Sequence, residues 1–179
     1  QIDCLYDVGN ALGNEERKLW TMSNGYALLN LAGLNINSQL SKLSNDKREE
    51  LKGKLKIGIQ WDTEVTLNAD RQIVSQAYCS ALPVTYSNLD SIYWESFAIL
   101  ILEATYEATL YAALMNFKKT GSKKVFLTLV GGGAFGNRVE WISDALIRTL
   151  KKFKYAPLDI KIVSHRCSNP RILALKEMI

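Results

Sequence analysis

The sequence predicts an α/β protein in which helices cover both faces of one mixed sheet, a three-layer α/β/α sandwich. An apolar, β-branched run at 125–130 leads through glycines into a segment with helical spacing that begins at Val139. Residues 54–65 alternate apolar and polar side chains, as a strand with two different faces does. Strands alternate with helices over the last hundred residues, which favours a layered domain. We expect the strands at 54–65, 72–81, 124–130 and 158–163 to share one sheet, with 125–130 at its centre.

The 179 residues are enough for a single domain with a sizeable core, which we assign to 1–179. Its first part, 1–53, is predicted to be rich in helix, with helical spacing at 1–12 and over most of 26–43. The α/β core is predicted at 54–179. Because the chain starts in an amphipathic helix without a preceding Met, we expect it to be a fragment or a processed piece of a longer protein.

The strand predicted at 54–65 places two carboxylates, Asp62 and Glu64, on one face. Side chains two residues apart on a strand stand about 7 Å apart, so the pair can share a proton, a sugar hydroxyl pair or an attacking water. The alternative is the solvated outer face of an edge strand. The next strand, 72–81, pairs with it as a hairpin and ends near Cys79 and Ser80, which lack a nucleophilic triad signature. Cys79 is therefore interpreted as a small buried apolar residue.

The long apolar segment 97–115 is predicted to be a helix inside the domain. Glu103 and Glu107 interrupt it, and charges at the middle of a membrane are costly, so we expect no membrane span.

The segment between the apolar run and the helix is a potential phosphate site. Glycines let the backbone approach a ligand, and the first N–H groups of a helix lack partners. The spacing fits G-x-G-x-x-G, yet the strand 158–163 carries its acid, Asp159, at its start rather than its end, which disfavours a dinucleotide site. No Lys-Ser or Lys-Thr follows, which excludes a P-loop, and a tight turn without a ligand is the remaining alternative. The candidate residues are Gly131, Gly132, Gly133, Ala134, Phe135, Gly136 and Asn137.

The composition and charge bear on the partners and the location of the protein. The formal net charge is +4, and the lysine clusters at 118–124 and 151–154 are interpreted as solvated surface, so no nucleic acid is expected as a partner. The cysteines suggest neither a disulfide framework nor a metal site, and they favour a reducing, cytoplasmic location. No signal peptide is visible. The cysteines are Cys4, Cys79 and Cys167.

Four segments carry a resemblance to a known family: IGIQWDTEVT, VSQAYCSALPVTYS, FAILILEATYEATLYAALMN and VFLTLVGGGAFGN. The chain resembles a divergent branch of the macrodomain family, the arginine-specific ADP-ribosyl hydrolases. That branch is known from bacterial effectors that remove ADP-ribose from ubiquitin and from eukaryotic relatives. The resemblance covers roughly 1–170 and is strongest over 54–137.

The resemblance implies a macrodomain-like sandwich whose glycine loop, 131–137, holds the diphosphate and distal ribose of ADP-ribose. It implies catalytic roles for Asp62 and Glu64, with Asp70 as a less secure counterpart. Members of the family carry an upstream segment with another part of the nucleotide site, so an upstream segment or a partner chain is expected to complete the site.

Two functions follow. The first is hydrolysis of the N-glycosidic bond between ADP-ribose and an arginine of a modified protein, with ubiquitin as a candidate and with no metal or cofactor. The second is a module that binds ADP-ribose without cleaving it. A third reading, an assembly subunit whose glycine loop binds nothing, stays open as well.

Overall fold

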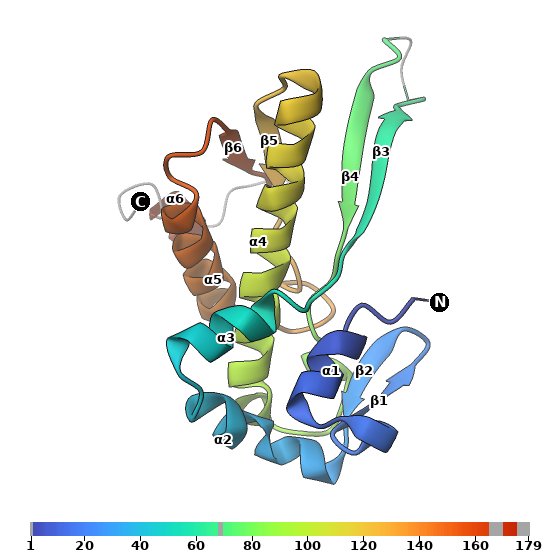
Figure 1. Cartoon of the computed structure of the whole chain (residues 1–179), viewed down its shortest axis with the longest axis vertical. Helices are drawn as coiled ribbons and strands as arrows, with labels where there is room; N and C mark the ends of the chain where they lie inside the picture. The colour runs from blue at the N-terminus through green and yellow to red at the C-terminus, as the bar shows by residue number, and fades with distance from the viewer. Residues whose placement is uncertain (1, 68–69, 165–169, 175–179) are drawn as a thin grey trace.

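One long helix, α4 (Glu95–Thr120), runs through the centre of the protein and contacts helices from both halves of the chain. The structure is a computed structural model that describes residues 2–67, 70–164 and 170–174. It is a mixed α/β fold, as predicted (Figure 1). The other α-helices of the described part are α1 (Tyr6–Leu12), α2 (Ile36–Ser41), α3 (Asn45–Lys52), α5 (Val139–Lys152) and α6 (Pro170–Ala174). The strands are β1 (Trp20–Ser23), β2 (Tyr26–Leu29), β3 (Gly58–Glu64), β4 (Ile73–Tyr78), β5 (Lys124–Leu127) and β6 (Asp159–Ile162).

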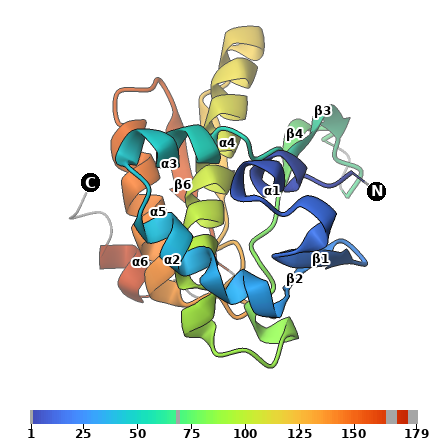
Figure 2. The ribbon, with the colours of Figure 1, turned by 60° about the horizontal axis from the view of Figure 1, so that its bottom comes forward.

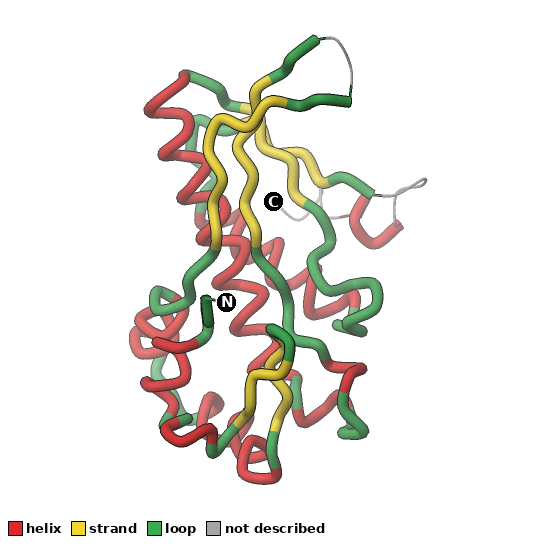
Figure 3. The backbone as a smooth tube through the Cα atoms, turned by 90° about the vertical axis from the view of Figure 1, so that its right-hand side faces the viewer, coloured by secondary structure: helices red, strands yellow, loops and turns green. Residues whose placement is uncertain are grey.

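The strands pair two by two. β1 pairs with β2 and β3 with β4, both antiparallel, while β5 and β6 form a parallel pair. The hairpin predicted from 54–65 and 72–81 is confirmed as β3–β4, and the strands predicted at 124–130 and 158–163 are confirmed as β5 and β6. Figure 3 shows the long β3–β4 ribbon extending beyond the helices at one end of the molecule.

The predicted single sheet is wrong for the described residues, because they form three separate two-stranded sheets. The segment 125–130 is therefore not central: among the described residues its strand, β5, has a neighbour on one side only, β6. The physical reason is that β4 and β5 each pack against α4 without hydrogen bonding to one another. Side-chain alternation identifies strands, but it does not say which strands are neighbours.

The N-terminal part differs from the prediction at residues 26–29, which form β2 rather than the start of a helix. The cause is the two-residue turn between β1 and β2, where Asn24 has φ 49° and Gly25 has φ 83°. Positive φ at both positions is typical of a type I′ turn, whose twist favours a hairpin over a helix. Trp20 of β1 is buried against Phe97 of α4, with ring centroids 5.1 Å apart, so this hairpin also rests on the central helix.

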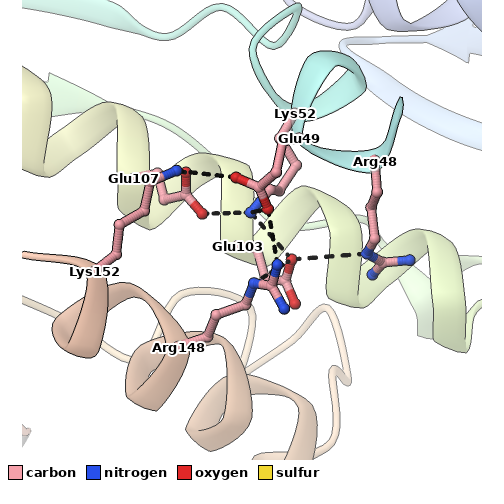
Figure 4. Close-up of polar contacts among 7 residues, drawn as sticks. All are labelled: Arg48, Glu49, Lys52, Glu103, Glu107, Arg148 and Lys152. Atoms are coloured by element: carbon pink, nitrogen blue, oxygen red, sulfur yellow. Dashed lines mark hydrogen bonds and ion pairs between the residues drawn. The ribbon is translucent and has the colours of Figure 1, made fainter. Parts of the chain in front are cut away.

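Ion pairs join α3, α4 and α5 where the three helices meet (Figure 4). Figure 2 shows α2 and α3 crossing α4, with α5 beside it. Lys52 of α3 lies 3.4 Å from Glu103 and 2.5 Å from Glu107, the two acids that interrupt the apolar segment of α4. By length and composition α4 could cross a membrane, but most of it is buried inside this fold, as expected of a core helix.

Candidate functional site

The glycine loop, residues 131–137, follows β5 and ends just before α5, as the sequence predicts. Gly131 has φ 79° and Gly136 has φ 66°, a backbone conformation that residues with a side chain adopt at a cost. A Cβ atom at Gly131 would come within 2.4 Å of the Ala81 Cβ, and one at Gly136 within 2.1 Å of the Thr85 Cγ2. These two glycines are therefore required by the fold itself.

The loop is fastened to the segment that follows β4. Thr85 donates from its hydroxyl to the Ala134 carbonyl at 2.5 Å and from its backbone N–H to the Phe135 carbonyl at 3.2 Å. The buried Asn137 donates from Nδ2 to the Leu82 carbonyl at 2.8 Å, and its backbone N–H donates to the Gly131 carbonyl at 3.0 Å. The two ends of the loop are thus drawn together and held in place.

Tyr106 of α4 fixes the start of the loop. Its hydroxyl donates to the Thr128 carbonyl at 2.9 Å and accepts from the Val130 N–H at 3.1 Å. Burial raises the pKa of Tyr106 to about 12, although the hydrogen bond from Val130 acts in the opposite direction. The tyrosine is therefore protonated at neutral pH and can keep both bonds.

Three consecutive backbone N–H groups of the loop have no hydrogen-bond partner within the described part of the chain. They belong to Gly133, Ala134 and Phe135, of which the first two residues are exposed. The N-terminus of α5, at Val139, follows two residues after the loop. Unpaired N–H groups near a helix N-terminus create a positive local potential that suits an anion such as a phosphate.

Three aromatic rings meet beside the loop, a feature that the sequence analysis missed. Phe135 contacts Tyr86 edge to face at 5.4 Å between ring centroids and Tyr26 at 5.7 Å, and the two tyrosines are 5.0 Å apart. Tyr26 is 38% exposed and Tyr86 is 45% exposed, so the cluster forms part of the surface. The rings come from three distant segments, and no spacing in the sequence signals that they meet.

The predicted catalytic carboxylates are exposed and already paired with cations. Asp62 forms an ion pair with Lys119 of α4, and a Glu64 oxygen lies 3.8 Å from the Arg71 side chain. The register of β3 against β4 shifts between Gln60 and Thr63, and Asp62 has φ 56° there. This β-bulge re-aims Asp62, so the simple alternation assumed for the two acids does not hold through it.

The structure does not bring the carboxylates and the glycine loop together. Asp62 pairs with Lys119, whereas the start of the loop is held by Tyr106, thirteen residues earlier on α4. At 1.5 Å per helical residue, the two contact points are on the order of 20 Å apart along the helix. The carboxylates and the loop are carried by strands of different sheets, β3 and β5. Asp70, the less secure counterpart, is exposed just before β4.

A sizeable cavity lies elsewhere, between the N-terminal elements and the segment after β4. Its volume is about 1020 Å³, and neither the two carboxylates nor the glycine loop lines it. Ala81 and Leu82 line this cavity and also contact the loop, so this segment separates the two. This cavity therefore does not join the carboxylates to the glycine loop.

No group of three or more His, Cys, Asp or Glu side chains that could hold a metal ion occurs among the residues described here. Burial raises the pKa of Cys79, whose sulfur lies 3.8 Å from the Thr109 hydroxyl, so the thiol form is favoured. Cys4 is also a free thiol, and Cys167 lies outside the described residues.

Comparison with known proteins adds no relative: no family model, no curated protein and no solved structure matches the chain.

Proposed function

We propose that the chain is an ADP-ribose-binding module whose glycine loop holds the diphosphate. The observation that carries the proposal is the set of three unpaired N–H groups at Gly133, Ala134 and Phe135. Phosphate oxygens accept hydrogen bonds from such groups, and the nearby start of α5 adds its dipole. The resemblance to macrodomains supplies the identity of the ligand.

The aromatic cluster beside the loop supports a nucleotide over a free phosphate. Tyr26, Tyr86 and Phe135 offer apolar ring surface next to the N–H groups, and a sugar or a base can pack against it. The proposal includes a macrodomain-like sandwich. Two facts favour it: β5 and β6 are parallel, and a glycine loop follows β5 and leads into α5.

Hydrolysis of ADP-ribosyl-arginine is a second proposal, and the conformation of Asp62 favours it. A non-glycine residue with positive φ inside a strand is strained, and such strain concentrates at functional sites. The substrate would be an ADP-ribosylated protein such as ubiquitin, in the cytoplasm. Because Asp62 lies far from the loop, this activity requires an additional segment or partner chain that bridges the two.

Titration calorimetry of the whole chain with ADP-ribose tests the first proposal. We expect binding that weakens about tenfold in Gly133→Ala, the equivalent of one lost hydrogen bond to a charged group. A Cβ atom at Gly133 meets no protein atom within 4 Å, so this variant keeps the fold and obstructs only an approaching ligand. Gly53→Ala, at the end of α3, is the matched control and should bind normally. Absence of binding at millimolar ADP-ribose would exclude both proposals.

The double variant Asp62→Asn with Glu64→Gln separates the two proposals. Release of ADP-ribose from an arginine-modified protein is measured beside binding of free ADP-ribose. Turnover by the wild-type chain that disappears in the variant, with binding intact, supports the hydrolase. A wild-type chain that binds without turnover acts, by itself, as a binding module.

A further inference from the structure

β5 has one edge paired and one edge open. Asp159 and Val163 donate their backbone N–H groups to the carbonyls of Lys123 and Leu127, at 2.7 and 2.8 Å. In a parallel pair alternate residues of a strand bond to the same neighbour, so Lys124 and Phe126 direct their N–H and C=O groups to the other edge. Only β6 pairs with β5 in the described part of the chain.

β4 has an open edge as well. The Val65 N–H donates to the Gln72 carbonyl at 2.8 Å, so Gln72 is directed towards the β3 side of the hairpin. Alternation along β4 then directs Ser75 and Ala77 towards the opposite edge, because the bulge lies in β3 and leaves β4 regular. Figure 1 shows β4 on the side of the hairpin nearer α4 and β5, with β3 beyond it.

The two open edges lie over the same helix and run in the same direction. Ser75 and Cys79 of the β4 segment contact Asn116 and Thr109, so β4 runs antiparallel to α4. β5 starts just beyond the C-terminal end of α4, and Thr128 reaches Tyr106, so β5 also runs antiparallel to α4.

The ends of both strands thus contact α4 within one helical turn, at Thr109 and Tyr106. Residues three apart on a helix share one face, so both strand ends rest on the same face of α4. A strand inserted between them would lie about 4.8 Å from each neighbour.

From these edges we propose that a single extended segment of a partner polypeptide inserts between β4 and β5 and pairs with both. The segment would join the two sheets into one five-stranded sheet across α4. Its inward side chains should be small or apolar, because α4 presents the half-buried Thr109 and Ala113 at this level. Its outward side chains should include an acid opposite Lys124, which is exposed beside Phe126 on the outer face of β5. Lys161 on the same face is already paired with Asp159.

A second copy of the chain is a poor occupant. Each strand in the described part already has a partner in a two-stranded sheet, so a copy could offer only a ribbon of two strands. Two strands need about 5 Å more width than one. An isolated hairpin is also at best marginally stable in water, so an added neighbouring strand would stabilise the β3–β4 ribbon.

The test first selects a peptide that binds the chain and then blocks the backbone hydrogen bonds of that peptide. A displayed library of nine-residue peptides, apolar at alternate positions and varied at the others, is panned against the full chain. The selected peptide is synthesised unmodified and with N-methyl groups at alternate residues, which block one edge. Hydrogen exchange of the Ser75, Ala77, Lys124 and Phe126 amides is then measured. We expect exchange at least about tenfold slower at both edges with the unmodified peptide and no effect of the methylated one.

The variant Ala77→Pro removes an N–H group from the open edge of β4 and leaves its pairing with β3 in place, so it should abolish peptide binding. If this variant does not fold, the comparison of the methylated with the unmodified peptide still tests the proposal. The proposal is overturned if no peptide is enriched, if protection appears at one edge only, or if methylation leaves binding unchanged. It is also overturned if self-association of the chain alone protects the same amides, which would make a second copy the occupant.

Discussion

The Lys52 ammonium on α3 lies 2.5 Å from a Glu107 oxygen on α4, and the two side chains are only 2% and 8% exposed. Lys152 of α5 reaches the other Glu107 oxygen at 2.5 Å. Glu103 lies 3.4 Å from Lys52 and 3.5 Å from Arg148. Each buried charge therefore has an opposite charge beside it, and each depends on its neighbours to stay charged.

Replacing Lys52 with Met should lower the free energy of unfolding by about 3–5 kcal/mol. The substitution preserves much of the side-chain volume but leaves the carboxylates of Glu103 and Glu107 without their shared cation. Lys54→Met is the control, because Lys54 forms an exposed pair with Glu50 and should change stability by less than about 0.5 kcal/mol. Urea unfolding measures both variants, and equal losses would contradict this account of the cluster.

The stability of the protein should fall as the pH drops from about 4.5 towards 2 because of Glu49. Burial alone would raise the pKa of Glu49, but hydrogen bonds from Lys52, Arg148 and Lys152 lower it to about 2. Since the folded pKa is below the unfolded one, the stabilisation is present above pH 4.5 and is lost as the pH falls through the folded value.

The Glu49 side chain is 37% exposed, so solvent screening reduces its contribution to about 1 kcal/mol. Chemical unfolding between pH 2 and 6 should therefore show a shallower acid loss in Glu49→Gln than in the wild type. Glu50→Gln, on the exposed side of α3, should keep the wild-type slope. Parallel curves for all three proteins would count against the assigned pKa.

Tyr106→Phe should destabilise the protein by about 1–3 kcal/mol, because the Thr128 carbonyl and the Val130 N–H both lose a partner. Thermal unfolding measures the loss. Tyr111→Phe, on the exposed side of α4, is the matched control and should be neutral. A neutral Tyr106→Phe would show that the hydroxyl does not fix the loop.

Gly136→Ala should lower the free energy of unfolding by about 1–3 kcal/mol, whereas Gly133→Ala should leave it within about 0.5 kcal/mol. Gly136 has positive φ and faces the Thr85 side chain, while Gly133 faces open space. The unfolding free energies of the two variants are measured by calorimetry. They distinguish a loop that packs tightly at Gly136 from one that tolerates a side chain equally at both positions. Equal effects would refute this division of roles.

Much of the secondary structure could be predicted from the sequence, because periodicity reports which face of an element is buried. The strands at 58–64 and 124–127 and the helix at 139–152 were found from their patterns. Residues 26–29 were missed, although Asn24 and Gly25 carry a strong hairpin signal, because the apolar residues that follow were interpreted with a helical period.

The candidate site could be predicted only in part, because its parts are joined through distant contacts. The glycine loop was located from its own residues. Its ties to Thr85, Leu82 and Tyr106 depend on segments that are 22 or more positions away. Asp62 and Glu64 were predicted on one face from regular alternation, which the bulge at Asp62 interrupts. No residue type in the strand signals that bulge.

α4 contacts β1 and the residues that directly follow β4 and β5, through Phe97, Thr109 and Tyr106. It therefore touches all three sheets or their ends. Within the described residues no strand of one sheet pairs with a strand of another. Unfolding should therefore proceed in separable units rather than by unzipping from sheet to sheet. The β3–β4 ribbon, which extends furthest from the core, should open first, and the amides in the buried half of α4 should be the last to exchange with solvent.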